Sequence, residues 1–164
     1  MSQLDIIHSK IMSREQLKRQ VAYWKFNDKK IVFTNGCFDI LHLGHVDYLA
    51  KARDLGGVLI LGLNTDASVQ RQGKGANRPI VDEHSRSVLT ASLRFVDAVI
   101  LFDEDTPYEL IKFIQPDVLV KGNDYKAEEI VGYDVVKANG GEVRTIPLVE
   151  GYSTSAIVAK IRKD

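Results

Sequence analysis

The sequence predicts an α/β fold with a doubly wound, five-stranded parallel sheet, helices on both faces and a further helix at the N-terminus. Five short apolar runs, rich in β-branched residues and mostly without polar alternation, are typical of buried parallel strands. Helical segments separate these runs, as the crossover connections of a parallel sheet require. The expected strands are residues 31–34, 58–63, 98–102, 118–120 and 142–146.

Capping signals mark the expected helices. Residues 13–16 (Ser-Arg-Glu-Gln) have the spacing of a capping box and predict a helix over 14–26, after a lead-in at 1–12. Pro107 follows Thr106 at a first helical position, where the missing N–H of proline costs nothing. Further helices are expected over residues 43–55, 66–70, 83–94, 107–114, 127–138 and 155–162.

Composition narrows the class of protein. A chain of 164 residues with 45% hydrophobic content suits one domain over 1–164, with residues 1–29 as a helical extension. The 22 basic and 22 acidic residues give a net charge of +0, which argues against nucleic acid as a partner. The single cysteine, Cys37, cannot form an intrachain disulfide, and no apolar stretch is long enough to span a membrane. We therefore expect a cytoplasmic protein with no membrane partner.

Two histidines, His42 and His45, follow the first strand at i, i+3 spacing. If a helix starts near residue 43, both imidazoles lie on one side of its first turn. That turn presents free N–H groups and the positive end of the helix dipole, and imidazole can donate hydrogen bonds to phosphate oxygens. Gly44 lets a ligand approach the backbone. The pattern predicts phosphate chemistry, and the alternative is two ordinary surface or capping histidines.

Polar residues also follow later strands, at the edge where a doubly wound sheet binds its ligands. They are residues 64–66 after the second strand, 121–125 after the fourth and 151–155 after the fifth. A Gly-rich loop with three cations lies at 70–79, which predicts a local anion site in a chain of zero net charge. The alternative for this loop is an ordinary solvated segment. Asp39 is expected to orient a histidine or to cap a helix.

Residues 36–45 (Gly-Cys-Phe-Asp-Ile-Leu-His-Leu-Gly-His) resemble the signature of the nucleotidyltransferase superfamily that includes the cytidylyltransferases. The resemblance implies a Rossmann-like fold in which the two histidines stabilise the phosphates of a nucleoside triphosphate. Residues 152–155 (Tyr-Ser-Thr-Ser) resemble the second signature of this superfamily, a turn that opens the last helix and holds triphosphate oxygens. Residues 121–125 resemble its segment near the base and ribose, and Arg86 matches an arginine that faces the phosphates.

The implied site divides into three overlapping groups of residues. Catalysis is assigned to His42, His45, Lys74 and Arg86. The acceptor phosphate is assigned to Asn64, Asp66, Lys74, Arg78 and Arg86. The nucleotide is assigned to Thr34, Asn35, Gly36, Cys37, Phe38, Asp39, His42, Gly44, His45, Lys121, Gly122, Asn123, Asp124, Gly151, Tyr152, Ser153, Thr154 and Ser155. Mg²⁺ is expected to arrive with the triphosphate, because no all-protein metal site is recognisable.

Within the superfamily, the resemblance is closest to the adenylyltransferases that form ADP-heptose, and it covers nearly the whole chain. Its supporting stretches are residues 30–45, 78–81, 119–122, 131–132, 139–143 and 149–154. The related glycerol-phosphate cytidylyltransferases carry Arg-Thr-Glu-Gly where this chain has Leu-Val-Glu-Gly at 148–151. This departure weakens the interpretation of the chain as an enzyme that uses CTP.

The resemblance therefore implies adenylyl transfer from ATP to D-glycero-β-D-manno-heptose 1-phosphate, with release of pyrophosphate, in the synthesis of lipopolysaccharide or another surface glycan. It also implies a homodimer whose small-molecule partners are ATP and a sugar phosphate. Two alternatives remain open. One is a glycerol-3-phosphate cytidylyltransferase or another nucleotidyltransferase with a phosphate acceptor. The other is a non-catalytic nucleotide-binding regulator that retains the fold.

Overall fold

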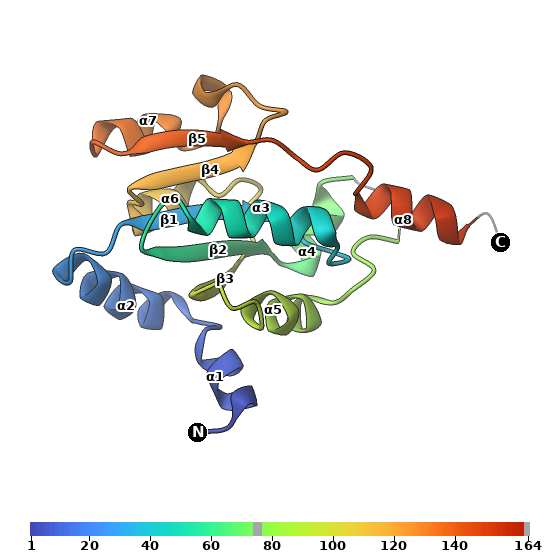
Figure 1. Cartoon of the computed structure of the whole chain (residues 1–164), viewed down its shortest axis with the longest axis horizontal. Coiled ribbons are helices and arrows are strands. Elements are labelled where there is room, and N and C mark those ends of the chain that lie inside the picture. The colour runs from blue at the N-terminus through green and yellow to red at the C-terminus, as the bar shows by residue number, and fades with distance from the viewer. Residues whose placement is uncertain (74–76, 163–164) are drawn as a thin grey trace.

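A five-stranded parallel sheet forms the centre of the molecule, in the order β3–β2–β1–β4–β5 (Figure 1). The computed structural model describes residues 1–73 and 77–162. The chain runs outward from β1 to β3 and then crosses back to β4, so the sheet is doubly wound as the sequence predicts. The strands are β1 (Ile31–Gly36), β2 (Val58–Asn64), β3 (Ala98–Phe102), β4 (Val118–Gly122) and β5 (Glu142–Ile146).

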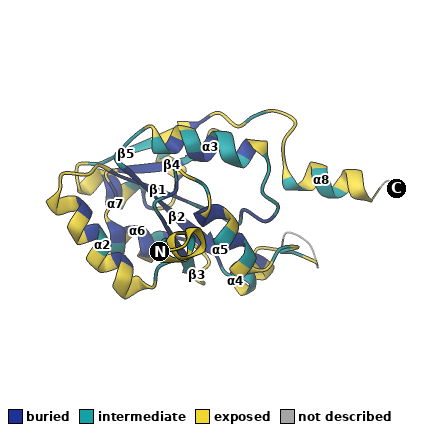
Figure 2. Ribbon diagram, turned by 60° about the horizontal axis from the view of Figure 1, so that its bottom comes forward, coloured by how far each residue is buried: buried dark blue, intermediate teal, exposed yellow. Residues whose placement is uncertain are grey.

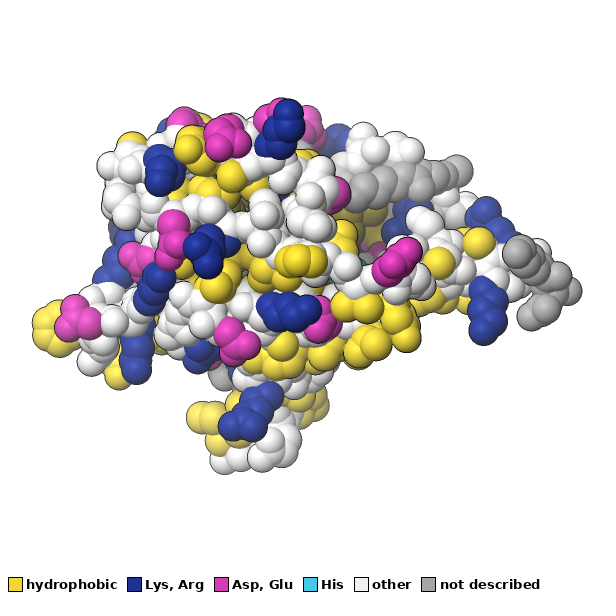
Figure 3. Space-filling model, turned by 45° about the horizontal axis from the view of Figure 1, so that its top comes forward, with side chains coloured by type: hydrophobic (Ala, Val, Ile, Leu, Met, Phe, Trp, Pro, Cys, Tyr) yellow, Lys and Arg dark blue, Asp and Glu magenta, His cyan; other side chains and the backbone are white. Residues whose placement is uncertain are grey.

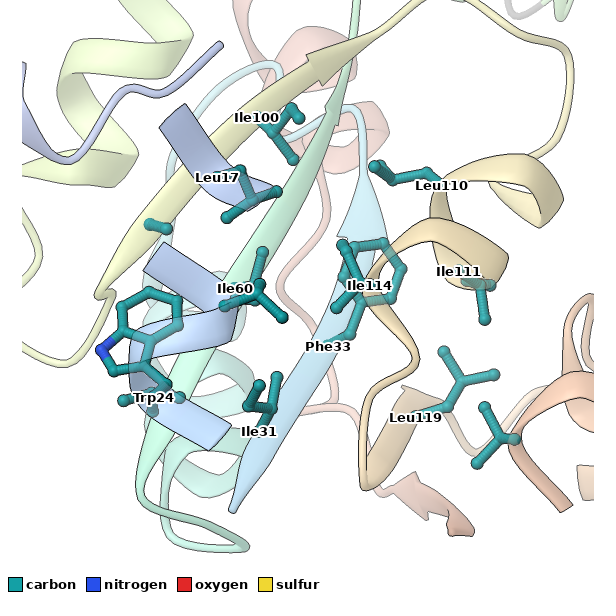
Figure 4. Packing of buried hydrophobic residues seen from close by; sticks show 14 of the residues in the cluster. Leu17, Trp24, Ile31, Phe33, Ile60, Ile100, Leu110, Ile111, Ile114 and Leu119 are labelled. Carbon is teal, nitrogen blue, oxygen red and sulfur yellow. The ribbon is translucent and has the colours of Figure 1, made fainter. Parts of the chain in front are cut away.

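Helices cover both faces of the sheet, because successive residues of each buried strand point to opposite sides. Phe33 belongs to the core under α2 and α6, whereas Val32 belongs to the core under α3. Figure 4 shows Leu17 and Trp24 of α2 on one side of Ile60. The helices are α1 (Gln3–Ser9), α2 (Arg14–Phe26), α3 (Leu43–Arg53), α4 (Asp66–Arg71), α5 (Glu83–Ala91), α6 (Tyr108–Ile114), α7 (Tyr133–Ala138) and α8 (Thr154–Ile161).

Buried residues concentrate along the strands and on the inner faces of the helices (Figure 2). The last helix differs, because none of the residues of α8 is buried and the helix projects from the body (Figures 1 and 2). No helix of the described chain is long and apolar enough to cross a lipid bilayer. The division into a helical extension at 1–29 and one domain over the whole chain stays a prediction.

The N-terminal lead-in expected at 1–12 contains a helix of its own, α1. Its N-cap is Ser2, whose hydroxyl accepts a hydrogen bond from the Asp5 N–H at 3.1 Å, while the Asp5 carboxylate accepts from the Ser2 N–H at 2.8 Å. This reciprocal pair is a capping box. The residues after α1 reach the sheet, where the Met12 N–H donates to the Val99 carbonyl at 2.9 Å.

A single glycine divides the helix expected over 127–138. A 3₁₀ turn covers Ala127–Glu129, and α7 starts only at Tyr133. Between them Gly132 has φ +89°, in the left-handed region that favours glycine. A Cβ on Gly132 would lie 2.6 Å from Cδ1 of Ile111, a fully buried residue of α6. The break therefore serves both the backbone turn and the packing of α7 on α6.

Gly132→Ala should lower the free energy of unfolding by about 2–3 kcal/mol, because it adds an unfavourable φ and a clash in the core. Gly140→Ala is the matched control. Gly140 also has a positive φ, +76°, but a Cβ there has no described neighbour within 4 Å. The control should lose only about 1 kcal/mol. Urea unfolding measures both values, and equal losses would contradict the proposed clash with Ile111.

Candidate nucleotide site at the carboxyl edge of the sheet

A cavity of about 340 Å³ lies at the carboxyl ends of β1 and β4, where the strand order reverses. Such switch points are where doubly wound sheets bind ligands. A more open hollow of about 690 Å³ lies at the opposite edge, near Lys30 and Asp117, away from all the predicted site residues. The smaller cavity is lined by Asn35, Gly36, Cys37, Phe38, His42, Gly44, His45, Tyr48, Lys121, Gly122, Asp124, Tyr125, Leu148, Val149, Tyr152, Ser153 and Thr154.

The two histidines stack on each other at the start of α3. Their ring centroids are 3.7 Å apart, with an interplanar angle of 20°. A Cβ on Gly44 would lie 3.0 Å from the His42 ring and 3.3 Å from Cβ of Tyr152, so glycine lets the ring and the segment before α8 approach this turn. The Nδ1 atoms of both His42 and His45 are buried; neither meets a hydrogen-bond partner of good geometry among the described residues, and the weak interaction of His45 with the Ile40 backbone only partly opposes the lowering of its pKa. A buried unpaired nitrogen is costly, which suits a ligand that pairs with it.

Burial also fixes the charge of this pair. Desolvation lowers the pKa of His45 to about 4, and the neighbouring His42 contributes to the same shift. Desolvation lowers the pKa of His42 as well. Both rings are therefore neutral at pH 7 in the free protein, and each can donate one N–H. A bound polyphosphate would favour the protonated rings and raise both pKa values.

His45 should make the folded state less stable in acid. Between pH 4 and 6.5 the unfolded chain binds a proton at His45 that the folded chain does not, so stability falls as the pH falls through this range. In His45→Gln that contribution is absent, and the melting temperature should change less between pH 6.5 and 4. Thermal unfolding across this range tests the difference. His8→Gln, at an exposed position on α1, is the control and should parallel the unmodified chain.

The start of α8 and the end of β4 form the other wall of the cavity. Ser153 is the N-cap of α8, and its hydroxyl accepts from the Ala156 N–H at 3.0 Å. Ser153 and Thr154 line the cavity, whereas Gly151 and Ser155 are not among its lining residues. The Lys121 ammonium donates to the Asn35 carbonyl at 3.2 Å. This bond joins the end of β4 to the end of β1.

Three predicted nucleotide residues support the site from outside the cavity. Thr34 is buried, and its hydroxyl lies 2.8 Å from the Tyr48 hydroxyl and 3.0 Å from the Val120 carbonyl, to which it donates. The Asn123 N–H donates to the Ile146 carbonyl at 3.0 Å. Asp39 is buried, and its carboxylate accepts from the Ile80 N–H at 2.9 Å, the Val81 N–H at 2.9 Å and Nε of Arg78 at 2.5 Å.

Arg86 of α5 is fully buried beneath the turn that follows β1. It donates from Nη1 to the Cys37 carbonyl at 2.7 Å, from Nη2 to Oδ1 of Asp66 at 2.6 Å and from Nε to the Val81 carbonyl at 2.9 Å. A direct contact of Arg86 with phosphate, as predicted, would require these bonds to break. Lys74, the other predicted catalytic cation, lies outside the described residues.

A second cavity of about 320 Å³ lies beside the first. The two cavities share Asn35, Gly36, Cys37, Lys121 and Tyr125. Of the residues predicted for the acceptor, Asn64 lines this second cavity, whereas Asp66, Arg78 and Arg86 do not. Its remaining lining residues are Gln72, Asp105, Thr106, Pro107, Glu129, Ile130 and Val131.

The sequence did not lead us to predict most of the residues that line only the second cavity. Asp105 and Thr106 follow β3, so the same strand-end rule that found the other segments would have found them. Glu129 lies in the region expected to be one continuous helix, where no signal marks it. Tyr48 lines the first cavity from α3, and burial raises the pKa of its hydroxyl well above the usual range. No group of three His, Cys, Asp or Glu side chains within 1–73 and 77–162 is placed to hold a metal ion.

Comparison with known proteins places this geometry in a family. Residues 33–160 match the family model described as Cytidylyltransferase-like. The chain belongs to the cytidylyltransferase-like family. The resemblance found in the histidine signature is thereby confirmed, and the match extends from β1 to α8. The stacked histidines and the Ser153 cap thus occupy the two ends of the cytidylyltransferase-like region.

Two relatives share most of this sequence. Bifunctional protein HldE of a Nitratiruptor species is 62% identical over 134 residues, which are 82% of this chain and 28% of the relative. Bifunctional protein HldE of Wolinella succinogenes is 54% identical over 153 residues, 93% of this chain and 31% of the relative. The cytidylyltransferase-like chain therefore spans less than a third of the length of these relatives.

Two solved structures resemble this cytidylyltransferase-like chain. One is the lipopolysaccharide core biosynthesis protein from Thermoplasma volcanium, with a TM-score of 0.62 and 32% identity over 76% of this chain and 99% of that one. The other is pantoate-beta-alanine ligase from Francisella tularensis, solved with beta-gamma ATP and beta-alanine. Its TM-score is 0.61 over 94% of this chain and 78% of that one. Because only 14% of the residues are identical, this likeness concerns the fold alone.

Proposed function

We propose that the chain transfers the adenylyl group of ATP to D-glycero-β-D-manno-heptose 1-phosphate, giving ADP-heptose and pyrophosphate. The observation that carries the proposal is the stacked histidine pair, whose unpaired nitrogens lie beside a cavity at the switch point of a cytidylyltransferase-like fold. The acceptor class is supported by the resemblance of the sequence to ADP-heptose-forming enzymes. The 32% identical structure, a lipopolysaccharide core biosynthesis protein, is consistent with it.

The proposed reaction needs no enzyme nucleophile. An oxygen of the sugar phosphate attacks the α-phosphorus in line, the bond from that phosphorus to the bridging oxygen breaks, and pyrophosphate leaves with the electron pair. His42 and His45 donate hydrogen bonds to the phosphate oxygens as negative charge moves onto the leaving group. Mg²⁺, which in this proposal arrives bound to the triphosphate, supplies further charge neutralisation.

We assign the nucleotide to the first cavity and the acceptor sugar to the second. The shared rim of Asn35, Gly36, Cys37, Lys121 and Tyr125 is where a phosphate in one cavity can approach a phosphate in the other. The far side of the second cavity carries amide, hydroxyl and carboxylate groups, which suit the hydroxyls of a sugar. Lys121 at the rim supplies positive charge between two anionic substrates. Cytoplasmic location is part of this proposal, because ATP is available there.

His45→Gln should lower kcat by about 100-fold or more, since a donor that acts on developing charge is lost. The KM for ATP should change much less, because the contact strengthens in the transition state. Pyrophosphate release with ATP and heptose 1-phosphate gives both values. His84→Gln, an exposed histidine in the first turn of α5, is the control and should retain full turnover. Normal turnover in His45→Gln would remove the histidines from the mechanism.

The same assay separates the alternatives when ATP and CTP are each paired with heptose 1-phosphate and glycerol 3-phosphate. Turnover with CTP and glycerol 3-phosphate alone would replace the proposed substrates. Nucleotide binding without turnover for any pair would favour a regulator. Turnover with ATP and heptose 1-phosphate supports the proposal.

Glu129→Ala should raise the KM for the sugar phosphate by about 10-fold, since a hydroxyl of the acceptor loses its hydrogen-bond acceptor. The KM for ATP should stay within about twofold, because Glu129 lines only the second cavity. Glu128→Ala is the control, since Glu128 has the same charge and is also exposed but lines neither cavity. Equal effects of the two substitutions would contradict the assignment of the acceptor to this cavity.

A further inference from the structure

The hydroxyl of Tyr48 is a buried polar group of the nucleotide cavity that the proposed reaction does not use. Tyr48 belongs to the second turn of α3, three residues after His45, and it lines the cavity although only 7% of it is exposed. Helical side chains lean toward the N-terminus of their helix, which for α3 is the end at the cavity. The hydroxyl lies 2.8 Å from that of Thr34, near the carboxyl end of β1.

The direction of the hydrogen bond between Thr34 and Tyr48 follows from the number of protons. Thr34 has one hydroxyl proton, which it donates to the Val120 carbonyl at 3.0 Å, since a carbonyl can only accept. The proton between the two hydroxyls therefore belongs to Tyr48. The backbone pairing of β1 with β4 reaches Phe33 and Leu119, so the Thr34 hydroxyl makes the next link between these strands. The sheet thus fixes where the Tyr48 proton points.

With its proton given to Thr34, the Tyr48 oxygen has lone pairs to offer and nothing to donate. Burial raises the pKa of the Tyr48 hydroxyl well above its ordinary range, and the negative charge of Asp124 raises it further. The hydroxyl is therefore neutral at pH 7 and cannot serve as a general base. Asp124 also lines the cavity, and its carboxylate accepts hydrogen bonds without donating any. This part of the cavity consequently requires donors from a ligand.

Other polar groups of the cavity have the opposite character. The rings of His42 and His45 and the ammonium of Lys121 are donors, which suit phosphate oxygens. Phosphate oxygens are acceptors, so they cannot pair with the Tyr48 oxygen. On the face of the molecule shown in Figure 3, Lys and Arg side chains alternate with Asp and Glu side chains, so this face has no field of one sign that could orient a nucleotide. The donors and acceptors within the cavity orient it instead.

The ribose is the part of a nucleotide that matches the Tyr48 oxygen. A nucleoside triphosphate carries donors on the ribose hydroxyls and on the amine of the base. Along α3 the three residues from His45 to Tyr48 rise by about 4.5 Å, a distance that a ribose with its hydroxyls spans. The ribose follows the α-phosphate directly, whereas the amine lies at the far edge of the base. With the phosphates at the histidines, a ribose hydroxyl is therefore the donor that reaches Tyr48.

We propose that the Tyr48 oxygen accepts a hydrogen bond from a ribose hydroxyl of the bound nucleotide, which makes Tyr48 the residue that selects ribonucleotides over deoxyribonucleotides. The inference rests on the nucleotide site of the proposed function and is independent of the acceptor sugar and of the base. A site built to bind a hydroxyl rejects the analogue that lacks it, because the buried oxygen of the protein then stays unpaired.

Binding of ATP, 2′-deoxy-ATP and 3′-deoxy-ATP, measured by titration calorimetry with Mg²⁺ and without acceptor sugar, tests the proposal. For the unmodified chain, the Kd of at least one deoxy analogue should exceed that of ATP by about tenfold. In Tyr48→Phe the Kd for ATP should rise while the Kd for that analogue changes little, so that their ratio falls to about one. Tyr23→Phe, at a 61% exposed tyrosine of α2, is the control and should keep the ratio of the unmodified chain.

Equal binding of ATP and both deoxy analogues by the unmodified chain would overturn the proposal without any variant. A Tyr48→Phe chain with normal circular dichroism and an unchanged ratio would do the same, since Tyr48 would then only support the fold. If CTP binds and ATP does not, adenylyl transfer fails as the proposed function, and CTP with its 2′- and 3′-deoxy analogues decides the role of Tyr48. Binding of neither triphosphate would overturn both proposals.

Discussion

The buried guanidinium of Arg86 is the interaction on which the site depends. Its three donors bind the Cys37 carbonyl, the Asp66 carboxylate and the Val81 carbonyl. These acceptors belong to the turn after β1, the start of α4 and the segment before α5. A buried charge is costly unless it is paired and hydrogen-bonded, so the three segments must meet at one point for the fold to tolerate Arg86. The cost of burying this charge thus specifies the geometry of the turn.

Asp39 reinforces the same arrangement from the opposite direction. Its carboxylate accepts two backbone N–H groups and Arg78 from the segment that Arg86 also binds through Val81. Phe38, between the two anchors, takes a positive φ of +47° and packs against His45. A non-glycine residue adopts that conformation only where its surroundings impose it. The stacked histidines are therefore oriented by buried polar contacts and not by helix α3 alone.

Much of the fold could be predicted because its signals are local. The runs at 98–102 and 142–146 match β3 and β5, and the Ser13 capping box marks the start of α2. The break at Gly132 could not be predicted in the same way, because it depends on where the side chain of Ile111 lies. Helix α1 also had local signals, the capping box at Ser2 and the helical spacing of Leu4, Ile7 and Ile11, and the last two pack against the core.

The site shows the same contrast between features with a local sequence signal and features that depend on packing. The segments after β1, β4 and β5 could be predicted to converge, because the carboxyl ends of parallel strands share one edge. The role of a cation within that edge could not, because charge and spacing do not reveal its partners. Arg86 is predicted to face phosphate, and in the structure its donors bind nearby Val81 and two acceptors distant in sequence, Cys37 and Asp66. Which arginine reaches the ligand depends on how many protein acceptors lie closer, and that number is a property of the packed structure.

The two walls of the nucleotide cavity consequently differ in how they are held. The histidine wall is fixed by Asp39 and Arg86, both buried, before any ligand binds. The Ser153 wall lies on α8, which has no buried residue in the described chain. Binding a triphosphate between a fixed wall and a weakly held one requires ordering of the second, and that ordering reduces the affinity that the contacts could provide. The weakly held wall, with Ser153 and Thr154 at the start of α8, therefore limits the nucleotide affinity more than the histidine wall does.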